Sequence, residues 1–121
     1  MKKMLITLTV LVASATAAFA LNPVDYEVFM KLNDNSTFKG LVRYLKVDNE
    51  QAENLKNVFT ITQNQMQSAL KSENDAAAEK AMNSNLANTR NILSNKQYKK
   101  FLTIVNLTIN NRYNEVLLSE N

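Results

Sequence analysis

Two residue types that carry much of protein chemistry are absent from this chain, which contains neither cysteine nor histidine. The absence of cysteine excludes disulfide bonds and a thiol nucleophile, so packing alone must hold the fold together. The absence of histidine removes the commonest general base, and both absences together remove the commonest zinc ligands. The carboxylates are scattered at spacings typical of helix surfaces. We therefore expect no enzyme activity, no cofactor and no metal site.

Glycine and proline are nearly absent as well, with one of each in 121 residues. The single glycine, Gly40, cannot form the kind of glycine-rich loop that cradles phosphate groups. So few helix breakers, together with many Leu, Ala, Lys, Gln and Met residues, favour an all-α fold. Gly40 itself falls inside a predicted helix, where glycine costs about 1 kcal/mol relative to alanine. It marks either a close contact between helices or a position without a special role.

Residues 1–20 have the pattern of a secretory signal peptide. Lys2 and Lys3 form a positive start, an apolar segment follows, and Ala18 and Ala20 are the small residues that a signal peptidase reads, with cleavage after Ala20. A membrane anchor is the competing interpretation, but a spanning helix needs roughly 20 predominantly apolar residues, about twice what precedes the small residues here. We expect residues 21–121 to form one periplasmic domain without stable membrane insertion.

The charge of the exported part is nearly balanced. The whole sequence has 14 basic and 11 acidic residues, and removal of Lys2 and Lys3 leaves 12 against 11. The net charge of residues 21–121 is therefore about +1 at neutral pH. Proteins that bind nucleic acids show a clear basic excess. We expect partners that are proteins and not nucleic acids.

Hydrophobic periodicity predicts three long helices, over residues 49–71, 73–93 and 95–118, preceded by one or two shorter ones. The short connections predict that sequential neighbours run antiparallel, as in a small helical bundle. One shorter helix is predicted over residues 36–46. Residues 22–30 fit either a short helix or an extended arm.

Each long helix carries a stripe of core-facing residues at steps of three and four. The stripe of the first consists of Leu55, Phe59, Thr62, Met66 and Ala69. The stripe of the second consists of Ala78, Met82, Leu86, Thr89 and Leu93. The stripe of the third consists of Tyr98, Leu102, Val105, Ile109 and Val116.

One five-residue pattern occurs twice, as VDNEQ at residues 47–51 and as LSNKQ at residues 93–97. Each copy has an apolar residue, a small polar residue, two spacers and a glutamine. The polar residue caps a helix, the glutamine reaches back to the backbone of the cap, and the apolar residue packs onto the new helix. The six motif residues are Val47, Asp48, Gln51, Leu93, Ser94 and Gln97. A third helix start is predicted at Ser72.

The repeat extends beyond the motif, because an offset of 46 residues also aligns Leu55 with Phe101 and Phe59 with Val105. Two similar cap-and-helix units therefore flank the middle helix. Two Leu-Thr-x-x-Gln-like motifs at helix starts behind a signal peptide resemble the Spy/CpxP-like family of periplasmic proteins. The resemblance covers roughly residues 36–113. Serine replaces threonine in the second motif, while valine and aspartate replace leucine and threonine in the first.

The resemblance implies a helical, often dimeric, cradle-shaped periplasmic protein. Members act as ATP-independent chaperones or as accessory proteins that damp an envelope-stress sensor. Some relatives bind zinc through histidine, which this chain lacks. We expect chaperone-like binding of partly unfolded or envelope proteins under envelope stress, with a homodimer as one possibility. The alternatives are a regulatory or adaptor protein with one specific envelope partner, and a helical domain of unknown function.

Two surfaces are candidates for partner binding. The first is a positive face of the helix at 36–46, formed by Lys39, Arg43 and Lys46. It would either steer acidic clients toward the protein or simply be a solvated polar face. The second is the side of the last helix opposite its main stripe, formed by Ile104, Leu107 and Leu118. This side either lies at the centre of the domain or forms a dimer or client surface.

Overall fold

The computed structural model describes residues 23–120, with the side chains of residues 25–115. In this range the chain forms α2 (Pro23–Met30), the 3-10 helix η2 (Lys31–Asn33), α3 (Asn35–Leu45), α4 (Asn49–Lys71), α5 (Asp75–Ile92) and α6 (Asn95–Glu120). The predicted all-α fold is confirmed, and residues 23–30 form a helix, not an extended arm. The predicted signal peptide, residues 1–20, and its cleavage point lie outside the described residues.

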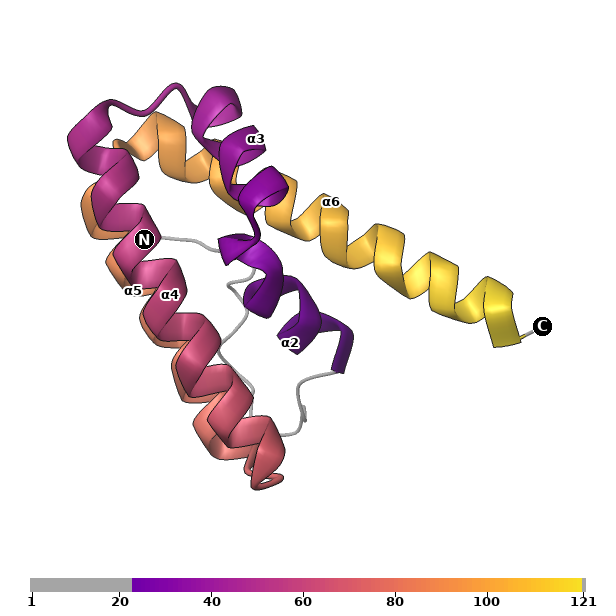
Figure 1. Cartoon of the computed structure of the whole chain (residues 1–121). Coiled ribbons are helices and arrows are strands. Elements are labelled where there is room, and N and C mark those ends of the chain that lie inside the picture. Colours follow the sequence, from indigo (N-terminus) through magenta and orange to yellow (C-terminus); the bar gives the residue numbers. More distant parts are fainter. Residues whose placement is uncertain (1–22, 121) are drawn as a thin grey trace.

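The helices have two different kinds of arrangement (Figure 1). The long helices α4 and α5 form an antiparallel hairpin and lie side by side along their length. The third long helix, α6, starts at the open end of this hairpin and then runs away from it at an angle. It passes α3 and α2, which fill the space between the hairpin and α6, and its C-terminal end projects beyond the other helices.

The core-facing side of α4 is the one that its periodicity predicts, because all five residues of its stripe are buried. The buried side of α5 agrees with the prediction at Ala78, Thr89 and Leu93 and differs by one residue in the middle of the helix. Ala81 and Asn85 are buried, whereas the predicted Met82 and Leu86 are partly exposed. Asn85 is accommodated because its side-chain amide donates a hydrogen bond to Thr62 Oγ1 at 2.9 Å, which satisfies the polar group inside the hairpin.

Aromatic rings join α3, α4 and α6 at the centre of the domain. The rings of Phe59 and Phe101 are stacked with centroids 6.1 Å apart, and Phe38 meets Phe59 edge to face at 6.0 Å. Phe59 and Phe101 are fully buried. The repeat aligned these phenylalanines with buried residues of the other unit, but Phe101 lies outside the stripe predicted for the last helix.

Both α2 and η2 pack directly against α4. Tyr26, Phe29 and Leu32 are buried against the core. Polar contacts add to this packing, since Lys56 Nζ donates to the backbone oxygen of Asn33 at 2.9 Å and Asn33 Nδ2 donates to a side-chain oxygen on α4 at 3.0 Å. Held in this position, α2 and η2 form one end of the candidate site described below.

The turn between α4 and α5 corrects one predicted helix start. Ser72 ends α4, where its hydroxyl donates to the Ser68 backbone oxygen at 2.9 Å. Asn74 caps α5 instead, and its side-chain oxygen accepts a hydrogen bond from the Ala77 N–H at 3.0 Å. The helix starts two residues later than predicted because Glu73 is needed for the reversal, with a left-handed φ of 55°.

Candidate functional site

Both predicted capping boxes are present in the structure. Asp48 Oδ1 accepts from the Gln51 N–H at 2.7 Å, and Gln51 Oε1 accepts from the Asp48 N–H at 3.0 Å. Ser94 Oγ accepts from the Gln97 N–H at 3.1 Å, and Gln97 Oε1 accepts from the Ser94 N–H at 2.9 Å. The apolar residues before the caps face the core, where Leu93 is buried and Val47 is partly buried.

The two glutamines also bind one another, although they are 46 residues apart. Gln51 Nε2 donates to Gln97 Oε1 at 2.9 Å and to the backbone oxygen of Ile92, the last residue of α5, at 3.1 Å. Gln97 Nε2 donates to the backbone oxygen of Leu45, the last residue of α3, at 3.3 Å. Each glutamine therefore caps its own helix and binds the end of the helix that precedes the other cap. We call this arrangement the glutamine lock.

The glutamine lock brings four helix ends together. Sequence reasoning treated the motifs as two separate caps, although the 46-residue repeat and its symmetry contained a signal for their pairing. Because the lock ties the start of α6 to the end of α3, these two helices lie close at one end. They run antiparallel from there, and α2 and η2 lie beside α6 at the other end.

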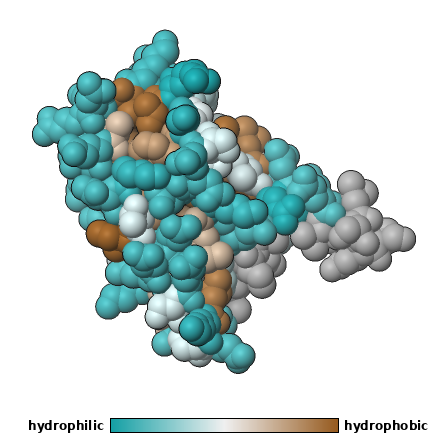
Figure 2. Space-filling view, viewed as in Figure 1, coloured by the Kyte–Doolittle hydropathy of each residue, from teal (hydrophilic) through white to brown (hydrophobic). Residues whose placement is uncertain are grey.

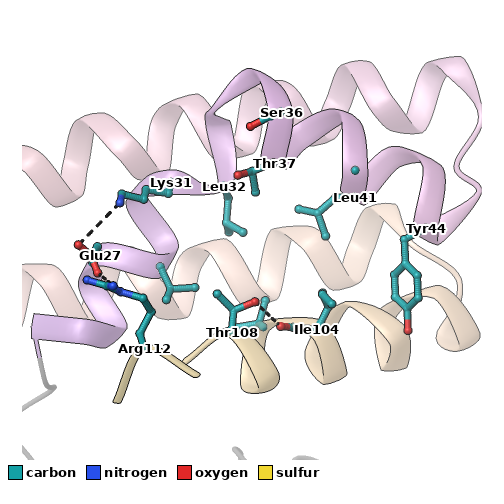
Figure 3. A pocket seen from close by; sticks show the side chains of 13 residues that line it. Glu27, Lys31, Leu32, Ser36, Thr37, Leu41, Tyr44, Ile104, Thr108 and Arg112 are labelled. Atoms are coloured by element: carbon teal, nitrogen blue, oxygen red, sulfur yellow. Dashed lines mark hydrogen bonds and ion pairs between the residues drawn. The ribbon is translucent and has the colours of Figure 1, made fainter. Parts of the chain in front are cut away.

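A groove of about 420 Å³ lies between these elements, with α3, η2 and α2 on one side and α6 on the other (Figure 3). Its volume falls within the range of about 300–1,000 Å³ that is typical of ligand pockets. The lining surface is mainly apolar, and its apolar residues are Val28, Leu32, Leu41, Tyr44, Ile104 and Val105. Figure 2 shows hydrophobic surface beside the place where α6 passes α3, on an otherwise mostly hydrophilic face.

Gly40 is part of the groove surface. A Cβ atom added there would meet no other atom within 4 Å, so Gly40 does not mark a close contact between helices. Its φ is not positive, so the backbone does not require glycine either. The absence of a side chain at this position therefore has one evident consequence, which is to leave the groove open.

The two ends of the groove differ in their polar contacts. At one end Glu27 binds Arg112 Nε at 2.8 Å and lies 3.8 Å from Lys31 Nζ (Figure 3). Hydrogen bonds to Glu115 and Glu27 raise the pKa of Arg112 further above its usual range. At the other end the ring of Tyr44 is 44 % exposed, and Lys100 Nζ lies 5.8 Å from its centroid.

The surface residues selected from the sequence are placed differently around this groove. Ile104 lines it, and Leu107 lies one turn further along α6, outside the lining and 52 % exposed. The side chain of Leu118 lies outside the described residues. The basic residues Lys39, Arg43 and Lys46 are all exposed, and none of them lines the groove.

Charge is unevenly distributed between the two halves of the domain. Residues 35–46 contain three basic residues and residues 95–112 contain four, and neither segment contains an acidic residue. The hairpin at residues 49–92, in contrast, contains five acidic and four basic residues. The helices that form the two long walls of the groove are therefore positively charged, although the domain as a whole is nearly neutral.

A buried tyrosine on α2 has a strongly shifted pKa. Tyr26 is 2 % exposed, and burial raises its pKa to about 12, with further contributions from the carboxylates of Asp75, Glu79 and Asp25. Its hydroxyl makes no hydrogen bond of good geometry with the described residues, although Asp75 is near enough to act on it. Tyr26 stays neutral at physiological pH and packs as part of the core.

Among the residues that the structure describes, no group of three or more carboxylates could hold a metal ion. No helix in the described part of the chain is long and apolar enough to cross a membrane. No protein-family model, curated protein or solved structure compared with the chain matches it. Its function is therefore inferred from its own residues, and the groove between α3 and α6 is the candidate binding site.

Proposed function

We propose that this protein is an ATP-independent, periplasmic, chaperone-like protein that binds partly unfolded polypeptides in the groove between α3 and α6. The observation that carries the proposal is an open, apolar groove between two positively charged helices, held at one end by the glutamine lock. Chemistry on the bound chain has no part in the proposal.

The groove suits weak binding of exposed apolar side chains. Its lining covers apolar surface of a client that would otherwise favour aggregation, and the exposed Leu107 extends the apolar surface beyond the groove. Exposed apolar patches of this kind mark interaction sites. The positive charge on both walls attracts acidic segments and accelerates encounter without demanding a close fit. Release needs no energy source because the contact area is small.

The proposed location rests on the signal-peptide pattern of residues 1–20, and the chaperone class is supported by the two motifs that resemble those of the Spy/CpxP-like family. In the proposal the motif residues act on the fold. The glutamine lock sets the position of α6 relative to α3 and so maintains the groove without contacting a client.

A second candidate function is that of an adaptor for one envelope partner. The end of the groove at Glu27 and Arg112 favours it, since their ion pair limits what fits there. A chaperone binds several unrelated clients weakly. An adaptor binds one partner saturably, with a few residues contributing most of the affinity.

The test uses protein expressed with its signal sequence and purified from the periplasm, mixed without nucleotide with two unrelated denatured clients during dilution. Light scattering reports aggregation. A Gly40→Leu variant fills the groove, and an Asn57→Leu variant adds the same side chain at an exposed position of α4. We expect wild type and Asn57→Leu to suppress aggregation and Gly40→Leu to lose most of that effect.

Scattering with the wild-type protein that equals the scattering with an inert helical protein of similar size would reject the chaperone function. Saturable retention of one envelope protein on immobilised wild type, lost in Gly40→Leu, would then favour the adaptor. Recovery of the protein from the cytoplasm with residues 1–20 intact would reject the proposed location.

A further inference from the structure

We propose that the preferred occupant of the groove is a short amphipathic helix of another protein, with acidic residues along the edges of its apolar face. This inference rests on the proposed function, since it takes the α3–α6 groove as a polypeptide-binding surface. It adds the conformation and the charge of the segment that binds.

The length of the groove fits the apolar face of two helical turns. The lining residues extend from Ser36 to Tyr44 on α3 and from Ile104 to Arg112 on α6, eight residue steps in each case. Eight steps along an α-helix span about 12 Å. Anchors at positions i, i+4 and i+7 of a bound helix span about 10.5 Å. Three anchors on one helix face therefore match the length of the groove, whose α3 and α6 walls end in the polar residues Ser36 and Arg112.

The walls favour a helix over an extended peptide. Both long walls are helices, whose backbone N–H and C=O groups are bonded within the helix except at the ends. An extended peptide gains affinity mainly from hydrogen bonds to an unpaired strand edge, which the described part of this chain does not offer. A helix satisfies its own backbone and needs only side-chain contacts, which are what the groove provides.

The rims of the groove set the charge of the occupant. Arg43 follows Gly40 by three residues and precedes Tyr44, so helix periodicity places it at the edge of the lining face of α3. Lys100 lies on the rim of the opposite wall, one turn before Ile104 and at the Tyr44 end of the groove, with its Nζ 5.8 Å from the Tyr44 ring centroid. Because no carboxylate occurs on either wall segment, both rims are positive. Acidic residues beside the apolar anchors of a bound helix would face these rims.

The same charges argue against a single-headed amphiphile such as a fatty acid. An acyl chain in the groove needs only one cation at an end to hold its carboxylate. Arg112 and Lys31 at one end both already face Glu27, and Lys100 at the Tyr44 end supplies a single charge. The remaining positive charge is spread over two rims, which suits several carboxylates on a helix better than one head group.

The experiment measures binding of three fluorescent peptides by anisotropy. The first has leucines at i, i+4 and i+7 with flanking glutamates, the second has lysines in place of the glutamates, and the third has the first composition with leucines at alternate positions. We expect the acidic helical peptide to bind at least about tenfold more tightly than either control at low salt. We expect that advantage over the lysine peptide to shrink at about 1 M salt, where charges are screened beyond about 3 Å.

Variants connect this binding to the groove. Gly40→Leu should weaken the acidic peptide at least about tenfold, whereas Asn57→Leu should not. Reversal of both rim charges, Arg43→Glu with Lys100→Glu, should weaken it roughly three- to tenfold and favour the lysine peptide. The matched control, Lys71→Glu with Lys80→Glu, makes the same charge change on exposed positions of the hairpin.

Equal binding of the acidic and lysine peptides, or tight binding of the alternating peptide, would overturn the inference. A fluorescent fatty acid that binds wild type but not Gly40→Leu, while the peptides do not bind, would overturn it in favour of a lipid. If the protein suppresses client aggregation but binds all three peptides equally well, the proposed function stands and only the inference of an acidic helical occupant is rejected. Loss of both would reject the function as well.

Discussion

The glutamine lock gives the sharpest prediction about stability, because two residues 46 positions apart share a hydrogen bond. Gln97→Ala removes the bond that closes its capping box, the bond from Gln51 and the bond to the Leu45 oxygen. A net contribution of about 0.5–1.5 kcal/mol for each hydrogen bond predicts a loss of roughly 2–3 kcal/mol. Gln51→Ala removes three comparable bonds and a longer one from Gln97 Nε2, and should cost a similar amount.

The double variant tests whether the lock is one unit. The shared bond is lost in either single variant, so the double variant should cost about 1 kcal/mol less than the sum of the two. Urea unfolding, followed by circular dichroism, measures the free energy of unfolding of each variant. In thermal unfolding, each single variant should lower Tm by roughly 10–20 °C. Gln67→Ala, on an exposed position of α4, is the control and should change stability by less than about 0.5 kcal/mol.

A further variant separates capping from locking. Gln97→Glu keeps a side-chain oxygen for the Ser94 N–H, and a carboxylate is favourable near a helix N-terminus. It loses the donor to the Leu45 oxygen, so it should be destabilised, although less than Gln97→Ala. Strictly additive effects of Gln51→Ala and Gln97→Ala, or single costs near that of Gln67→Ala, would refute a locked pair.

Three other predictions concern the groove and the core. Gly40→Ala should stabilise the domain by about 0.5–1 kcal/mol in urea unfolding, because alanine favours the helix and its Cβ meets nothing within 4 Å; a loss of stability would contradict an open groove surface. The pKa of Tyr26 is about 12 in the folded protein and about 10 in the unfolded chain. The contribution of Tyr26 to the free energy of unfolding should therefore be fully present below pH 10, and about 2 kcal/mol should be lost as the pH rises toward 12. Tyr26→Phe should reduce this fall, and an unchanged pH profile would count against the raised pKa. Asn85→Asp should destabilise the hairpin by at least about 2 kcal/mol at pH 7, since it buries a carboxylate and removes the donor to Thr62, and recovery of stability at acidic pH is the check.

Local patterns in the sequence were sufficient for some features and not for others. The bounds predicted for α4 agree with the structure, and all five residues of its stripe are buried, because Leu55, Phe59 and Met66 recur at helical spacing with no competing apolar face. Only the middle of the α5 stripe was predicted wrongly, because hydropathy favours Leu86 over Asn85. The burial of Asn85 depends on a hydrogen bond to another helix, which no pattern within α5 contains.

The groove could not be predicted because it depends on contacts between distant segments. The direction of α6 follows from the glutamine lock and from the position of α2 and η2, and neither is a property of α6 alone. The sequence places Ile104 and Leu107 opposite the main stripe of the last helix, but only the structure separates the residue that lines the groove from the one outside it. Gly40 gave an ambiguous signal until the empty space above it was known.

The most direct test of the groove as the binding site is an NMR titration of the ¹⁵N-labelled protein with an unfolded client. The chain has one glycine, so the Gly40 amide is identified by residue type and reports on the groove surface. We expect client binding to shift or broaden the Gly40 and Ile104 amide signals and to leave that of Ile61, exposed on α4, unchanged. Changes confined to the outer face of α4, with Gly40 and Ile104 unaffected at saturation, would contradict the proposed site.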